Sequence, residues 1–242
     1  MNAIEIKALT KKYRDTVAVD TLTLNIAKGE LFALLGVNGA GKTTTVKMLS
    51  CLTAPTSGDA LLLGKSICRE TSEVKKLIAV SPQESAVAPG LTVRENLELI
   101  SGIHGFSKEK QNSKIKELTE LFGLDVQSKK KAGKLSGGWQ RRLSIAMALI
   151  SEPQILFLDE PTLGLDVIAR SDLWDIIRAL KGRVTVILTT HYMEEAESLS
   201  DRIAIMKDGR LLICDTADKI KETAGTDNFE EAFIRIVKGV AK

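Results

Sequence analysis

The stretch Leu31-Phe-Ala-Leu-Leu-Gly-Val-Asn-Gly-Ala-Gly-Lys-Thr43 decides the fold, because it joins an apolar run to a glycine-rich loop. Its second part, from Gly36, has the spacing G-x-x-x-x-G-K-[ST], and the following residues Thr44–Leu52 are compatible with a helix. In such a loop, backbone N–H groups surround a phosphate chain, and the helix directs its positive N-terminal end at the same anion. An ordinary glycine-rich turn does not need this order of strand, spacing and helix. The sequence therefore predicts a nucleotide-binding P-loop.

The residues of this loop have different tasks. Gly39 and Gly41 allow the backbone to approach the phosphates closely, and Lys42 can reach the β- and γ-phosphates of ATP. Thr43 offers a hydroxyl to Mg²⁺. The predicted nucleotide-binding residues of the segment are Gly36, Asn38, Gly39, Ala40, Gly41, Lys42, Thr43 and Thr44.

Two carboxylates follow a second apolar run, Ile155-Leu-Phe-Leu-Asp-Glu160. Asp159 is expected at the carboxyl end of a buried strand, where open α/β sheets place their ligand crevice, and there it can hold the Mg²⁺ that bridges the phosphates. Glu160 can polarise the attacking water as a general base. On its own, an Asp-Glu pair before Pro161 is equally compatible with a turn or helix cap. The P-loop in the same chain favours a catalytic role for the pair over a cap.

Ser136, Gly137 and Gly138 have the pattern of a helix N-terminus, with a hydroxyl N-cap and two glycines that expose backbone N–H groups. An amphipathic helix follows over Arg141–Ile150. Arg141 and Arg142 could pair with phosphates or carboxylates, but two surface arginines on a helix are more often solvated. This helix end is a second anion site, although one chain binds a single γ-phosphate. We therefore expect a head-to-tail dimer in which each such helix caps the nucleotide on the partner's P-loop.

Two further polar residues complete the set. Gln83 follows the apolar segment Leu77–Val80, and His191 follows Val184–Thr190. Each is a weak signal by itself, but their order with the P-loop, Leu135-Ser-Gly-Gly-Trp-Gln140 and the Asp-Glu pair is specific. From about Ile4 to Leu212 the chain resembles the nucleotide-binding subunits of ATP-binding cassette (ABC) transporters.

This resemblance implies roles for individual residues. It implies that His191 contacts the γ-phosphate and orients the water, and that Gln83 touches Mg²⁺ and reports its state to a partner subunit. Together with the analysis above, the metal ligands would be Thr43, Gln83 and Asp159. Tyr13 has the position of the aromatic that stacks on adenine, and Asp166 belongs to the loop that links the two sites. The chain departs from the family pattern at Trp139, where glutamine is usual, and at Val167, where proline is common.

The pattern of apolar segments predicts an α/β fold: a P-loop NTPase core with a parallel sheet, an N-terminal antiparallel β subdomain and an inserted helical subdomain over about residues 91–151. Thr92 with Glu95 forms a capping box, and Ser107 caps a second helix. Asp208-Gly209 predicts a hairpin. Residues 1–242 are expected to form one nucleotide-binding domain. Its short tail, residues 215–242, would hold a helix capped by Asp227 that carries Phe229, Phe233 and Val237 on one face.

Composition excludes other classes. The formal net charge is only +3, so no broad nucleic-acid-binding surface is expected. The three cysteines are widely spaced and fit reduced thiols. No apolar run approaches the ~18 residues that span a bilayer. A transport pathway would therefore belong to a separate transmembrane permease, and this chain would sit on the cytoplasmic face of the cell membrane.

The sequence favours an ATPase subunit of an exporter, because Thr189-Thr-His-Tyr-Met-Glu-Glu-Ala-Glu197 and the C-terminal pattern resemble the ABC-2 branch. An importer subunit is the nearest alternative, since its site chemistry is identical. A soluble cassette of another pathway is less favoured. A DNA-acting ATPase is disfavoured, because Gln83 and Ser136 lie too close in sequence for an inserted coiled coil. Neither the transported substrate nor the choice between homodimer and heterodimer follows from the sequence.

Overall fold

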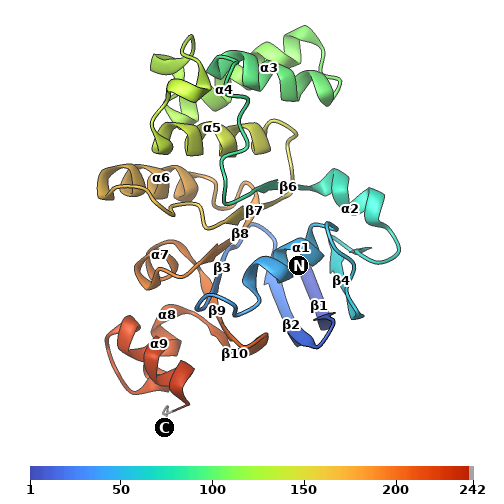
Figure 1. Cartoon of the computed structure of the whole chain (residues 1–242), viewed down its shortest axis with the longest axis vertical. Coiled ribbons are helices and arrows are strands. Elements are labelled where there is room, and N and C mark those ends of the chain that lie inside the picture. The colour runs from blue at the N-terminus through green and yellow to red at the C-terminus, as the bar shows by residue number, and fades with distance from the viewer. Residues whose placement is uncertain (240–242) are drawn as a thin grey trace.

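A six-stranded sheet runs through the middle of the molecule in the computed structural model, which describes residues 1–239 (Figure 1). Its strand order is β10-β9-β3-β8-β7-β6. Neighbouring strands are parallel except β9 and β10, which form the hairpin predicted at Asp208-Gly209. The α/β fold with a parallel sheet is therefore confirmed. The strands are β3 (Leu31–Leu35), β6 (Ile78–Ser81), β7 (Ile155–Asp159), β8 (Thr185–Thr190), β9 (Arg202–Lys207) and β10 (Arg210–Asp215).

Both faces of this sheet are covered. In β3, Leu31, Ala33 and Leu35 belong to one hydrophobic cluster, whereas Phe32 and Leu34 belong to another. This division arises because successive side chains of a strand point to opposite faces. All five residues are buried, as expected for a parallel strand with cover on both sides. Each large side chain buried in this way stabilises the fold by ~1.5–3 kcal/mol.

One face is covered by the N-terminal part of the chain. A four-stranded antiparallel sheet, in the order β2-β1-β4-β5, shares its apolar cluster with α1 (Lys42–Leu49) and α2 (Thr71–Leu77). The predicted antiparallel sheet is thus present, although its first two strands are longer than the apolar runs indicated, and α2 was not expected. The strands are β1 (Asn2–Tyr13), β2 (Thr16–Ala27), β4 (Ser57–Leu62) and β5 (Lys65–Ser66).

The other face carries a helical layer, which lies at the top of Figure 1. It consists of α3 (Val93–Ile103), α4 (Lys108–Phe122), two short 3₁₀ turns and α5 (Gly137–Leu149). Thr92 forms the predicted capping box with Glu95, and Ser107 caps α4 through the N–H of Lys110. The layer shares one apolar cluster with the sheet, and α5 packs directly on β6 and β7. Residues 91–151 enclose these helices, and their behaviour as a separate subdomain stays a prediction.

The remaining helices are α6 (Val167–Ala179), α7 (Met193–Leu199), α8 (Ala217–Ala224) and α9 (Phe229–Lys238). The predicted tail helix is α9, but its cap was assigned wrongly. Asn228 is the N-cap, and its side chain accepts a hydrogen bond from the N–H of Glu231 at 2.9 Å. The helix α8 was not predicted. Within residues 1–239, no helix combines the length and the apolarity needed to cross a membrane.

Candidate functional site: a nucleotide groove at the carboxyl ends of the strands

A groove of about 820 Å³ brings most of the predicted site residues together. It is formed where β3, β7 and β8 end, which is the edge at which parallel sheets hold their ligands. The loop after β3 lines it, as do Tyr13 and Leu163. The lining residues are Tyr13, Thr16, Val17, Ala18, Asn38, Gly39, Ala40, Gly41, Lys42, Thr43, Thr44, Gln83, Glu160, Leu163, His191 and Asp208.

Gly41 explains the local shape of the P-loop. Its φ angle of 100° lies in the left-handed region, and a Cβ atom there would come within 2.5 Å of the carbonyl oxygen of Ala18. Gly41 is also the N-cap of α1 and makes no side-chain cap hydrogen bond. The first N–H groups of α1 therefore have no side-chain acceptor at this cap and are available to an anion in the groove.

Lys42 is nearly buried, with 5% of its side chain exposed. Its Nζ donates to the carbonyl oxygens of Gly36 at 2.7 Å and Val37 at 3.3 Å. Burial lowers the pKa of Lys42, and the charges of Glu160 and Asp159 oppose this shift. The amino group is thus held inside the loop, at the level where a phosphate chain would lie.

Asp159 lies beneath the groove, where its Oδ1 accepts hydrogen bonds from the hydroxyls of Thr43 at 3.3 Å and of Thr189. Among the described residues, no group of three or more His, Cys, Asp or Glu side chains could hold a metal ion. Mg²⁺, however, is usually bound by one or two carboxylates together with substrate phosphates and waters. The hydroxyl and carboxylate oxygens of this pair therefore fit a Mg²⁺ that is shared with phosphate. Gln83, which lines the same groove, completes the predicted set.

Glu160 and His191 both line the groove and lie next to each other. Oε1 of Glu160 lies 3.2 Å from Nδ1 of His191 and 4.0 Å from Nζ of Lys42. The backbone of Glu160 has a positive φ of 46°, a strained conformation for a residue with a side chain. It is held there by hydrogen bonds from its N–H to the Oγ1 of Thr189 at 3.0 Å and to the Thr189 carbonyl at 3.1 Å. Sequence reasoning missed Thr189, which donates to the carboxylate of Asp159 and accepts from the backbone N–H of Glu160.

The predicted residues at the start of α5, together with Asp166, lie apart from this groove. Ser136, Gly138 and Asp166 line a second hollow of about 350 Å³. Ser136 is the N-cap of α5, but the predicted side-chain cap hydrogen bond is not made. Asp166 instead caps α6, where its Oδ1 accepts from the N–H of Ala169 at 2.8 Å. Trp139 also lines the hollow, and the guanidinium of Arg142 lies 4.7 Å from the centre of its ring.

The expectation of a solvated Arg141 is wrong, because this side chain is buried beneath the loop that carries Glu160. The spacing along α5 does not distinguish Arg141 from Arg142, because both lie three and four residues before buried residues of the helix: Ser144 and Ile145 for Arg141, and Ile145 and Ala146 for Arg142.

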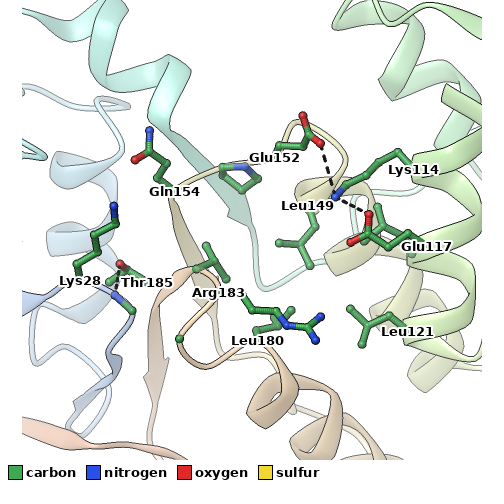
Figure 2. Close-up of a pocket in the computed structure, with 15 residues that line it drawn as sticks. Lys28, Lys114, Glu117, Leu121, Leu149, Glu152, Gln154, Leu180, Arg183 and Thr185 are labelled. Atoms are coloured by element: carbon green, nitrogen blue, oxygen red, sulfur yellow. Dashed lines mark hydrogen bonds and ion pairs between the residues drawn. The ribbon is translucent and has the colours of Figure 1, made fainter. Parts of the chain in front are cut away.

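A further cavity, of about 370 Å³, lies away from the P-loop between α4, the end of α5 and the turns before β3 and β8 (Figure 2). Leu121, Leu149 and Leu180 line it. Its acids Glu117 and Glu152 both pair with Lys114, at 2.9 Å and 3.8 Å. Of these two spaces, the groove at the carboxyl ends contains the P-loop, Glu160 and His191, so we assign the nucleotide to the groove.

The fold and the groove together define a P-loop NTPase. The family model described as ABC transporter matches residues 19–163, which is more than half of the chain. The chain therefore belongs to the ABC transporter family and is an ATP-binding ATPase of that family.

Relatives and solved structures agree with this family. A daunorubicin resistance ATP-binding protein of Streptomyces coeruleorubidus is 41% identical over 229 residues, covering 94% of this chain and 72% of the relative. A probable multidrug ABC transporter ATP-binding protein of Escherichia coli is 40% identical, and the match covers 97% of this chain and 41% of the relative. Among solved structures, an ATP-binding subunit of an ABC transporter has a TM-score of 0.85 with 27% identity, and covers 97% of this chain and 99% of its own. A dimeric ATP-binding cassette bound to ADP and Pi has a TM-score of 0.78 with 28% identity, and covers 88% and 98%.

Proposed function

We propose that this ATPase powers export through a separate transmembrane permease, at the cytoplasmic face of the cell membrane, as a subunit of an ABC-2 type transporter. The observation that carries the ATPase mechanism is the meeting of Lys42, Glu160 and His191 in one groove at the end of the parallel strands. The names of the relatives support the direction of transport, since they describe drug resistance and multidrug transport.

Each residue of the groove has a task in hydrolysis. The N–H groups at the start of α1 and Nζ of Lys42 bind the phosphates, and Tyr13 stacks on the adenine. Thr43, Asp159 and Gln83 would hold Mg²⁺, which when bound neutralises phosphate charge. Glu160 accepts the proton of the attacking water, and His191, 3.2 Å from the Glu160 carboxylate, orients that water.

Two separate anion sites support a dimer. The N-terminal end of α5 opens at the second hollow and not at the groove of its own chain. Val167 and Ile168, which follow Asp166 in the chain, are 79% and 75% exposed, and Ile168 lines that hollow. Such exposure is unusual for adjacent apolar side chains. A head-to-tail sandwich would cover them and place Ser136, Gly137 and Gly138 on the γ-phosphate of the partner. Either two copies of this chain or a copy and another cassette could form it.

An importer subunit and a soluble cassette of another pathway would use the same groove. The neighbouring reading frame separates these functions. A polytopic protein with about six spanning segments, without a periplasmic binding protein nearby, would support export. A binding protein gene at that place would support import.

The nucleotide site is tested by Lys42→Ala, with Lys47→Ala as the control. Both lysines lie on α1, but Lys42 is buried in the groove and Lys47 is exposed. Loss of a charged hydrogen bond of ~1.5–3 kcal/mol should weaken ATP binding by at least about tenfold in Lys42→Ala. Lys47→Ala should bind ATP as the wild type does. Titration with ATP gives the readout, and unchanged affinity in Lys42→Ala would disprove the phosphate site.

A further inference from the structure

Arg141 is the most heavily hydrogen-bonded buried cation near the site. Only 3% of the residue is exposed. Its Nε donates to the carbonyl oxygen of Pro161 at 2.9 Å, and its Nη2 donates to that of Asp159 at 2.9 Å. Its Nη1 donates to the carbonyl oxygen of Pro82 and, at 3.4 Å, to that of Gln83. All three nitrogens of the guanidinium therefore hold backbone and not side chains.

These carbonyls belong to two loops that carry site residues. Asp159 and Pro161 enclose Glu160, and Pro82 precedes Gln83. Arg141 itself lies on α5, the helix that begins directly after Ser136. One guanidinium thus joins three segments: the loop of the general base, the loop of the Mg²⁺ ligand and the helix whose end opens at the second hollow.

Only arginine suits this position. Its planar fork presents five N–H donors in fixed directions, whereas lysine is a compact point charge. Burial lowers the pKa of Arg141 to about 10, and the charges of Asp159 and Glu195 oppose the shift, so the group is a cation at neutral pH. Removing a cation from water costs several kcal/mol of solvation free energy. The hydrogen bonds to the carbonyls and the charges of Asp159 and Glu195 offset this cost. An apolar residue would avoid this cost but would leave the loops unjoined.

We propose that Arg141 is a positioning residue. It couples the positions of the loops that carry Glu160 and Gln83 to the position of α5. When the γ-phosphate of the partner chain binds at the start of α5, the guanidinium transmits the helix position to the hydrolytic site of its own chain. The two sites of the dimer therefore hydrolyse ATP cooperatively. This inference rests on the sandwich dimer of the proposed function, but it assigns the communication between its sites to one side chain.

The experiment compares Arg141→Met and Arg141→Lys with Arg235→Met in the assembled transporter. Arg235 is the matched control because its Nη1 also donates to two backbone carbonyls, those of Ala224 at 2.9 Å and Gly225 at 3.0 Å, in α8 and its C-cap. ATP affinity, kcat, the Hill coefficient for ATP and thermal unfolding are measured for each variant.

We expect ATP affinity within about twofold of the wild type in both Arg141 variants, because the P-loop is intact. We expect kcat to fall by about 10–100-fold, the effect of displacing a catalytic group by about 1 Å, and the Hill coefficient to fall towards one. Arg141→Lys keeps the charge and so controls for misfolding, and it should still lose cooperativity. In a third variant, Arg141→Ala, guanidinium added to the assay should restore part of kcat. Arg235→Met should lower stability without changing kcat or cooperativity.

Different outcomes overturn different proposals. A folded Arg141→Lys with wild-type kcat and Hill coefficient would disprove the positioning role. Parallel losses of ATP affinity, kcat and thermal stability would reduce Arg141 to a structural residue and also disprove it. A wild-type protein with a Hill coefficient of one would disprove the communication through Arg141. A wild-type protein that stays monomeric with ATP in size-exclusion chromatography would instead disprove the sandwich dimer of the proposed function.

Discussion

At the scale of single residues, Glu195 on α7 is a second buried charge beside the site. It is fully buried, and its Oε1 accepts hydrogen bonds from the hydroxyl of Thr162 at 2.8 Å and from Nε1 of Trp174 at 3.2 Å. Within residues 1–239, its Oε2 has no hydrogen-bond partner. Burial raises the pKa of Glu195, and the hydrogen bonds from Thr162 and Trp174 together with the charge of Arg170 oppose the shift. Glu195 thereby ties the loop after Glu160 to the segment after His191.

This raised pKa predicts a pH-dependent stability that Glu195→Gln removes. The folded state holds the proton more tightly than the unfolded state, so the carboxyl favours folding below its ordinary pKa of 4.5. This advantage is lost as the pH rises from 4.5 towards the raised pKa of the folded state. The free energy of unfolding of the wild type, relative to Glu195→Gln, should therefore fall over this window and then level off.

Urea unfolding at a series of pH values measures this difference. Glu194→Gln is the control, because Glu194 is the exposed neighbour on the same helix. The Glu195 and Glu194 variants should differ in pH profile. A wild-type minus Glu195→Gln difference that does not change between acidic and neutral pH would contradict a raised pKa.

At the scale of elements, the start of α5 is a helix end without a side-chain cap. Its position in the second hollow predicts the effect of Ser136→Arg. The substitution adds bulk and positive charge where the phosphate of the partner would bind, but it leaves the P-loop of its own chain intact. ATP binding should survive, and hydrolysis in the assembled transporter should fail.

Nucleotide titration and phosphate release separate these two effects. Ser113→Arg, at an exposed position on α4, adds the same group elsewhere in the helical layer and should leave both unchanged. Normal hydrolysis by Ser136→Arg would show that the start of α5 does not contact the nucleotide.

At the scale of the whole molecule, hydrolysis is expected to dissolve the dimer, so that a chain without its base should remain closed. Glu160→Gln keeps the shape of the side chain but removes the proton acceptor, and turnover should fall by about 10²–10⁴-fold. The ATP-bound dimer should then accumulate, because two phosphate chains each join a P-loop to the α5 of the other chain.

Size-exclusion chromatography of Glu160→Gln, with ATP and with Mg²⁺-free ATP to remove residual turnover, measures this accumulation. The control Glu194→Gln should behave as the wild type. A monomer that hydrolyses ATP at the wild-type rate would exclude Glu160 as the base.

The sequence by itself determined the features that depend on local chemistry. The P-loop, the Asp159-Glu160 strand end, the caps at Thr92 and Ser107 and the hairpin at Asp208 follow from patterns a few residues long. Such patterns fix φ and ψ angles and hydrogen bonds within one turn or strand, so they can be read without the rest of the chain. The order of these patterns along the chain then indicated the family.

Only the tertiary structure decided how distant segments meet. Arg141 looked like a surface residue, but it binds carbonyls up to 59 residues away in sequence, because α5 packs against the ends of β6 and β7. Thr189 contacts Asp159, and Glu195 contacts Thr162 and Trp174, in the same way: packing brings together segments that are far apart in the sequence. The cap of α9 fell on Asn228 and not on the adjacent Asp227, a choice between two competent caps that local chemistry left open. Burial and long-range hydrogen bonds depend on packing, and a residue type alone does not specify them.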